Sequence, residues 1–358
     1  MRKEEIELFK ALCSFKAEGF DETLLDAATP SVLGYLFFNR MQAIAYGTLK
    51  KHELLGKVNR EFRNSIKESY ELNAEKNKSY FWCVQHLEKL LSCCQCNYAL
   101  LKGAYLCRYY PDGYRTSNDI DVLLHPKDIS EIGNRLLEDG FKQGNIRNGE
   151  FTPATRKEII ASKMMRGETV PYIKEVNLPG RRFLEVDINF SLDYKPGDTV
   201  LIEEMINNVV VQEMDNYCVR TLRWDDFFLH LCSHLYKEAT TLPWVEMNRD
   251  MTLYKYCDIY MLLNDAAEEQ VHSLFNRASE IGVETICAFA VLQASKLLYL
   301  DNVYAVSMAE RILKSNPNFI HTVISPKEKK EYLFIEKDIT QRFFADNRMS
   351  FLREVKKE

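Results

Sequence analysis

The stretch that decides the fold reads LLKGAYLCRYYPDGYRTSNDIDVLL and runs from Leu100 to Leu124. Its end, from Ile120 onward, is almost wholly apolar and predicts a buried β-strand. Because side chains alternate along a strand, Asp119 and Asp121 point to the same side of it. Two carboxylates held side by side repel each other, and a shared divalent cation removes that repulsion. Their oxygens suit Mg²⁺, with Mn²⁺ as an alternative, and therefore predict a metal site.

Residues on the N-terminal side of this pair add to the prediction. Lys102 and Gly103 follow a short apolar run. The glycine lets the backbone approach a phosphate closely, and the lysine supplies a positive charge. Arg115 and Ser117 come shortly before Asp119. The alternative is that the first aspartate only caps a turn and the second lies on a solvated edge, since a bare Asp-x-Asp is common.

A later strand carries a third carboxylate pattern. From Phe183 to Phe190, apolar side chains alternate with Glu185, Asp187 and Asn189. This alternation predicts a half-buried strand with one polar face.

The order of these features resembles that of the DNA polymerase β-like nucleotidyltransferase superfamily. That order is a strand, Lys-Gly, a helix, Arg-x-Ser-x-Asp-Ile-Asp, and a third aspartate on a later strand. More narrowly, the chain resembles an uncharacterised bacterial nucleotidyltransferase family with Lys-Gly in place of the usual Gly-Ser, over roughly residues 30–263. The resemblance implies that Asp119, Asp121 and Asp187 are catalytic and hold the metals. It also implies that Lys102 and Gly103 bind the triphosphate.

The implied reaction is of the EC 2.7.7 type, in which a nucleoside monophosphate passes from a nucleoside triphosphate to a hydroxyl. The acceptor would be a small molecule or a protein side chain, with nucleic acid less favoured. Arg115, Ser117, Lys255 and Asp258 join the nucleotide site by the same resemblance, since related enzymes place polar residues of the later helix near the nucleotide. Lys-Gly lacks a hydroxyl usually aimed at the phosphates, and Asn189 and the phenylalanine after it stand where relatives often have His and Trp.

Two other functions fit parts of the pattern. The chain could keep the fold as a catalytically inactive nucleotide-binding or interaction protein, because fold does not guarantee activity. Less favoured is a glycosyltransferase whose Asp-x-Asp binds a nucleotide-diphosphate sugar through a metal. That class needs a doubly wound nucleotide domain before the motif, whereas a helical pattern precedes it here.

Composition sets broad limits on the protein. The chain has 358 residues, of which 46% are hydrophobic and 28% charged, which is ordinary for a globular protein. Lys plus Arg number 47 against 52 for Asp plus Glu, which disfavours a broad nucleic-acid-binding surface. No apolar leader and no membrane-length apolar run is evident, so a cytoplasmic protein without a membrane partner is expected.

The remaining pattern predicts an α+β fold that is mostly α-helical. A small mixed sheet within residues 97–218 would lie between helical regions of residues 1–96 and 219–358. Residues 57–102 contain neither Gly nor Pro and predict one long helix or two in tandem. The basic stretch 143–167 is expected to be irregular, either a flap over phosphates or a solvated loop. Pro326 is expected to open a tail helix, and His230 and His234 to pack rather than bind metal.

Overall fold

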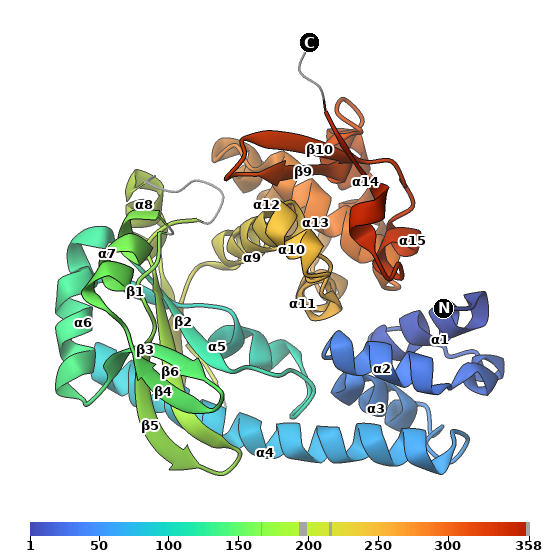
Figure 1. Cartoon of the computed structure of the whole chain (residues 1–358), viewed down its shortest axis with the longest axis horizontal. Helices are drawn as coiled ribbons and strands as arrows, with labels where there is room; N and C mark the ends of the chain where they lie inside the picture. Colours follow the sequence, from blue (N-terminus) through green and yellow to red (C-terminus); the bar gives the residue numbers. More distant parts are fainter. Residues whose placement is uncertain (166, 193–198, 215–216, 356–358) are drawn as a thin grey trace. The chain divides into compact units, whose positions relative to one another are not determined.

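The structure is a computed structural model that describes residues 1–165, 167–192, 199–214 and 217–355 (Figure 1). It is 55% helix and 17% strand with a mixed sheet, which confirms the predicted α+β class and its mostly helical content. Its contacts divide the chain into two compact units, residues 71–227 and residues 1–70 with 228–358. The three-part division predicted from the sequence, with boundaries after residues 96 and 218, stays a prediction.

The unit of residues 71–227 is built on a six-stranded mixed sheet. Its strand order is β1-β2-β6-β5-β3-β4, and β2 and β6 are parallel while the other neighbours are antiparallel. The strands are β1 (Tyr98–Leu100), β2 (Asp119–Leu124), β3 (Lys142–Arg147), β4 (Glu150–Pro153), β5 (Tyr172–Leu178) and β6 (Arg181–Asn189). The Leu100–Leu124 stretch therefore contains the last residue of the edge strand β1 and the whole of its neighbour β2.

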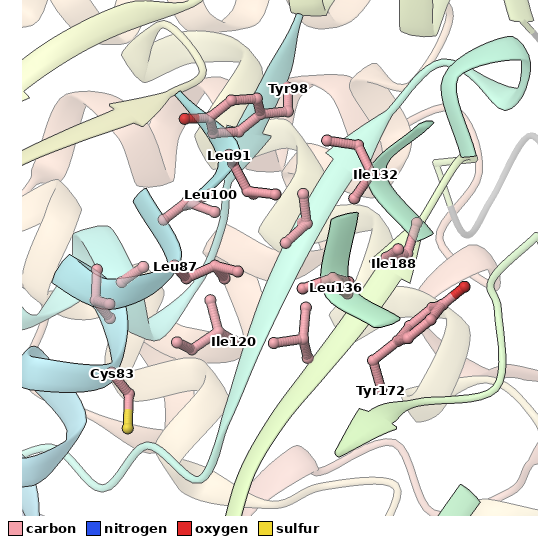
Figure 2. Packing of buried hydrophobic residues seen from close by; sticks show 14 of the residues in the cluster. Cys83, Leu87, Leu91, Tyr98, Leu100, Ile120, Ile132, Leu136, Tyr172 and Ile188 are labelled. Atoms are coloured by element: carbon pink, nitrogen blue, oxygen red, sulfur yellow. The ribbon is translucent and has the colours of Figure 1, made fainter. Parts of the chain in front are cut away.

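One face of this sheet forms the hydrophobic core. Ile120 and Ile188 contribute from β2 and β6, and they pack with Leu87 of the long helix α4 (Arg60–Leu91) and Leu136 of α6 (Ile129–Glu138), as Figure 2 shows. Because strand side chains alternate, burying every second residue of β2 and β6 here leaves the residues between them on the opposite face. The alternation of apolar and polar residues in the sequence therefore corresponds to two faces of the sheet, one against the hydrophobic core and one polar.

Short elements complete this unit. They are α5 (Gly103–Leu106), α7 (Arg156–Met165), α8 (Thr199–Asn207) and the hairpin of β7 (Val210–Glu213) and β8 (Cys218–Thr221). The single helix α4 confirms the long helix expected after residue 57. The expectation of an irregular stretch at residues 143–167 was wrong, because the antiparallel hairpin of β3 and β4 and then α7 occupy most of it.

The other unit is mainly helical. Its elements are α1 (Lys3–Cys13), α2 (Pro30–Phe38), α3 (Gln42–Lys51), α9 (Trp224–Ala239), α10 (Leu242–Glu246), α11 (Leu253–Asn264), α12 (Glu268–Glu280), α13 (Glu284–Leu297), α14 (Val303–Leu313), α15 (Ile339–Phe343), β9 (Thr322–Ser325), β10 (Lys330–Phe334) and β11 (Leu352–Glu354). The helix expected at Pro326 was wrong, because that residue lies in the turn between two antiparallel strands. Among the described residues, no helix is both long and apolar enough to span a bilayer.

Candidate functional site

The polar face of β2 and β6 gathers four acidic side chains. In the parallel register, Asp119 lies opposite Glu185, and Asp121 lies opposite Asp187. Paired residues of neighbouring strands share a face, and so do residues two apart, so all four carboxylates lie on one side of the sheet. The three aspartates singled out from the sequence are therefore brought together. Glu185 is an addition, although its place two residues before Asp187 on an alternating strand was visible in the sequence.

Lys102 reaches into this acidic face. Its Nζ lies 2.7 Å from Oδ1 of Asp121, which is almost fully buried. Asn189 Nδ2 donates to the same oxygen over 3.3 Å. The Lys102 backbone has φ 44°, in the region that favours glycine, and its carbonyl accepts from the amides of Tyr105 and Leu106 at the start of α5. A non-glycine residue in this backbone conformation destabilises the protein by on the order of 1–3 kcal/mol, and the rest of the fold must offset that cost.

Gly103 is required by close packing rather than by its backbone angles. A Cβ added here would lie 2.3 Å from Ser117 Oγ and 2.6 Å from the Tyr80 hydroxyl oxygen, closer than side chains tolerate. Ser117 Oγ in turn accepts from Arg115 Nη1 over 2.5 Å, and both side chains are buried. Arg115 and Ser117 therefore lie beside Gly103, next to Lys102, and their assignment to the nucleotide stays a prediction.

Two residues that the sequence did not single out fix the backbone leading into Asp119. The Tyr80 hydroxyl donates to the Asp119 carbonyl over 3.2 Å. The Arg181 guanidinium donates to the Ser117 carbonyl over 2.6 Å and also to the Asn118 carbonyl, and it lies 5.2 Å from the centre of the Tyr80 ring. Neither residue carries a local sequence signal, because one lies within a long helix and the other starts a strand.

The charges of the acidic face are only partly balanced. Burial, and then the charges of Asp121 and Asp119, raise the pKa of the Asp187 carboxyl well above its ordinary value. Burial, and then Asp119, also raise the pKa of Glu185. Asp187 Oδ1 is buried and has no hydrogen-bond partner among the described residues. A buried acceptor without a donor costs about 1–3 kcal/mol, and a bound cation would remove that cost.

This set of donors fits the predicted metal, because Mg²⁺ and Mn²⁺ both prefer carboxylate oxygens. In the part of the chain that the structure describes, no three Asp, Glu, His or Cys side chains already stand in the arrangement of a metal site. The Asp121 carboxylate is turned to Lys102 instead. Metal binding by the three aspartates therefore remains a proposal, and it requires their side chains to turn toward a common ion.

A pocket of about 580 Å³ adjoins the acidic face at Asp187. Its walls come from β3, from α7 and from residues 168–171. This last segment is fixed to the sheet, because the Thr169 amide donates to the Ile188 carbonyl over 2.9 Å and Glu168 forms a β-bridge with Asn189. The stretch expected to be a loop thus builds one wall of a pocket beside a predicted catalytic residue.

The predicted residues of the later helix lie in the other unit. Lys255 on α11 forms an ion pair with Glu238, and its Nζ lies 5.6 Å from the centre of the Trp244 ring. Asp258 is buried. His234 Nε2 lies 3.2 Å from Glu238 Oε1 on the same helix, and the expected packing role of that histidine stays a prediction. The assignment of Lys255 and Asp258 to the nucleotide stays a prediction.

Comparison with known proteins gives two similarities. Residues 28–299 match a family model described as uncharacterised nucleotidyltransferase. A crystal structure of an antigenic nucleotidyltransferase-like protein from Paracoccidioides brasiliensis matches at 14% identity and a TM-score of 0.33, over 57% of this chain and 89% of that one. No curated protein matches the sequence.

Proposed function

Because the chain belongs to the uncharacterised nucleotidyltransferase family, we propose that it transfers a nucleoside monophosphate from a nucleoside triphosphate to a hydroxyl of an acceptor, and that it depends on a metal. One observation carries the proposal. Asp121 and Asp187 lie opposite each other on parallel strands, and Asp187 keeps a buried oxygen without a described partner. The order of Lys-Gly, Arg-x-Ser-x-Asp-Ile-Asp and a later aspartate supports the narrower resemblance to polymerase β-like enzymes.

The transfer exchanges one phosphorus–oxygen bond for another. The acceptor oxygen bonds to the α-phosphorus, the bond from that phosphorus to the oxygen bridging the β-phosphate breaks, and pyrophosphate leaves. Asp187 receives the acceptor's hydroxyl proton, a task suited to a carboxylate whose pKa is raised by burial and by the charges of Asp121 and Asp119. Lys102 supplies positive charge to the phosphates as the leaving group gains negative charge.

Asp119, Asp121 and Asp187 would hold Mg²⁺ or Mn²⁺, which when bound lowers the pKa of the attacking hydroxyl and neutralises the departing pyrophosphate. Two further residues, Tyr80 and Arg181, position the strand that carries the first two aspartates. Tyr80 and Arg181 fix the backbone before Asp119 through its own carbonyl and those of the two preceding residues.

The ion pair of Lys102 and Asp121 favours a second candidate, a nucleotide-binding protein without turnover. In that protein the Lys102 ammonium would stay beside Asp121, where a metal would otherwise bind, and would itself balance part of the negative charge of the acidic face. Both candidates bind a nucleoside triphosphate, and only the first releases pyrophosphate.

The test measures binding and turnover separately. Calorimetric titration with each nucleoside triphosphate, with and without Mg²⁺, identifies the nucleotide, and pyrophosphate release with a metabolite pool reports transfer. Asp119→Asn and Asp121→Asn should abolish the Mg²⁺-dependent part of both signals. Asp119→Asn leaves the Lys102–Asp121 ion pair intact, so its loss of signal would not reflect a broken ion pair. The control is Asp112→Asn, an exposed carboxylate of the same unit. Wild-type activity in both site variants would refute the proposal.

A further inference from the structure

The helix α7 has two sides with different surroundings. Glu158, Ala161 and Ser162 line the pocket beside Asp187. Because they are spaced three and four residues apart, they share one side of the helix, which we call its inner side. With about 3.6 residues per turn, the opposite side carries a different set of residues, which does not line that pocket.

This outer side of α7 consists of Arg156, Lys157, Ile160, Lys163 and Met164. All five side chains are exposed, and the two apolar ones are 49% exposed for Ile160 and 81% for Met164. These two residues are four positions apart and therefore lie side by side on the helix. Single exposed apolar residues are ordinary, whereas neighbouring ones are what a contact surface presents.

The cations around this apolar pair are not balanced. By helical spacing, Arg156 and Lys163 lie on one flank of the pair and Lys157 lies on the other. None of the three forms an ion pair or a side-chain hydrogen bond with any residue that the structure describes. The one carboxylate in the α7 sequence, that of Glu158, is on the inner side and accepts hydrogen bonds from Thr155. The outer side therefore carries a net positive charge.

An exposed apolar pair between unbalanced cations fits an acidic protein surface. We propose that the outer side of α7 docks an acidic segment of a protein partner. Apolar side chains of that segment would cover Ile160 and Met164, and its carboxylates would pair with the flanking cations. Apolar contacts within a polar rim are the usual arrangement of a protein interface, and Met and Arg are enriched there. Rim charges of this kind steer and orient a partner of opposite charge.

Two other anionic occupants fit the outer side less well. Single-stranded nucleic acids combine phosphate contacts with stacking on aromatic side chains, and the α7 sequence has no aromatic residue. Phosphate contacts alone would leave the exposure of Ile160 and Met164 unexplained. Helices that lie on membranes present Trp, Phe or Leu on their apolar face, whereas the outer side of α7 presents one Ile and one Met. Both occupants are outcomes of the test.

The position of α7 places such a partner beside the candidate site. A helix with its side chains is about 10–12 Å across, and the inner side of this one lines the pocket at Asp187. A protein docked on the outer side would therefore lie about one helix diameter from that pocket. Its contacts do not involve the carboxylates of the proposed chemistry, so the inference is independent of the proposed function.

Three synthetic peptides test the inference on the full chain. They are helical, equally long and fluorescently labelled, and they combine glutamate with leucine, lysine with leucine, and glutamate with glutamine. Fluorescence anisotropy at low salt would measure their affinities. We expect the glutamate–leucine peptide to bind roughly tenfold more tightly than either of the others, because it alone matches both the charge and the apolar pair. Its affinity should fall as NaCl is raised, since salt screens exposed charges.

Variants of the outer side separate the apolar and the charged contribution. Ile160→Ser combined with Met164→Ser should weaken binding of the glutamate–leucine peptide roughly fivefold, as the loss of apolar anchors at an interface does. Lys163→Glu should weaken it roughly threefold at low salt and less at high salt. The matched controls are Val200→Ser on α8 and Lys78→Glu on α4, two exposed residues of the same unit, and both should leave the affinity unchanged. Circular dichroism would check that each variant is folded.

Single-stranded RNA and vesicles of phosphatidylcholine with phosphatidylserine are tested in the same way. If either binds more tightly than the glutamate–leucine peptide, and the outer-side variants lose that binding, the surface is one for nucleic acid or membrane and the inference is overturned. Equal binding of the three peptides, no peptide binding, or unchanged peptide binding in the outer-side variants would also overturn it. Nucleoside triphosphate titration and pyrophosphate release test the proposed function separately.

Discussion

Lys102 Nζ lies 2.7 Å from Asp121 Oδ1, and Asp121 is the residue that the parallel register sets opposite Asp187. The lysine therefore acts as an internal counter-ion at the centre of the acidic face. Its unusual backbone angle, φ 44°, shows that this placement is maintained against a local cost. A residue held in this way is a strong target for substitution.

Lys102→Ala should lower kcat/KM for the nucleoside triphosphate by roughly 10²–10³, the effect of removing one positioned charge-stabilising group. The matched control is Lys174→Ala, since Lys174 pairs with Asp139 and its register partner on β6 is the core residue Leu184. Steady-state kinetics on both variants, with folding checked by circular dichroism, would decide the matter. A loss below about threefold in Lys102→Ala would correspond to an exposed contact and remove the lysine from the site.

Asp187→Asn should make the protein more stable at neutral pH while abolishing turnover. Burial and the neighbouring aspartates raise the pKa of Asp187 in the native state above the ordinary 3.8. As the pH rises through 3.8, the unfolded chain releases this proton before the native protein does. The free energy of unfolding therefore falls as the pH rises from 3.8 to the raised native pKa of Asp187, and this contribution is constant above that native pKa. The variant lacks this fall and should gain on the order of 1 kcal/mol, the lower range for a relieved buried polar group.

Urea unfolding of wild type and Asp187→Asn at several pH values between about 4 and 8 measures this difference. Asp112→Asn serves as the exposed control and should follow the wild-type curve. A variant that is less stable than wild type across the whole range would contradict the prediction.

Gly103→Ala should destabilise the protein by about 1–3 kcal/mol, because the new Cβ would overlap Ser117 Oγ and the Tyr80 hydroxyl. Combining it with Ser117→Gly and Tyr80→Phe removes both obstructing oxygens and should recover part of the loss, which a thermodynamic cycle of unfolding free energies would reveal. Gly34→Ala on α2 is the control, since nothing lies within 4 Å of its added Cβ. Strict additivity of the three substitutions would argue against the packing explanation.

Arg181→Lys should lower kcat and reduce the unfolding free energy by about 1–3 kcal/mol, because one ammonium cannot replace the two guanidinium bonds to the Ser117 and Asn118 carbonyls. The neighbouring Arg182→Lys should change stability by less than about 1 kcal/mol, since its ion pairs with Glu150 and Glu175 are exposed. Equal effects of the two substitutions would show that Arg181 does not position the aspartate strand.

The sequence predicted the two strands of the site because period-two alternation is a local signal. Asp119, Asp121 and Asp187 could be assigned to strands from their apolar neighbours, and the structure places them on one face. The parallel pairing of β2 with β6 could not be read locally, because it joins segments separated by more than fifty residues. Lys102 was singled out, yet neither its ion pair with Asp121 nor its positive φ could be predicted from the residue pattern.

The stretch 143–167 shows why other predictions failed. Its many charged residues resemble a loop, but β3 and β4 pair as an antiparallel hairpin with little apolar content, and the turn at Asn148 and Gly149 uses positive φ at both positions. Pro326 likewise suggests a helix start, whereas it begins the turn between β9 and β10. In both places tertiary pairing decides a structure that local propensity leaves open.

The ion pair of Lys102 and Asp121 also has a consequence for the order in which ligands bind. A lone divalent cation would have to displace the Lys102 ammonium from Asp121. A cation that arrives with a triphosphate brings the negative groups to which the ammonium can turn. The affinities of the two ligands should therefore be cooperative, and by thermodynamic linkage each should tighten the other by the same factor. The acidic face would then bind the metal–nucleotide complex more tightly than it binds the free metal.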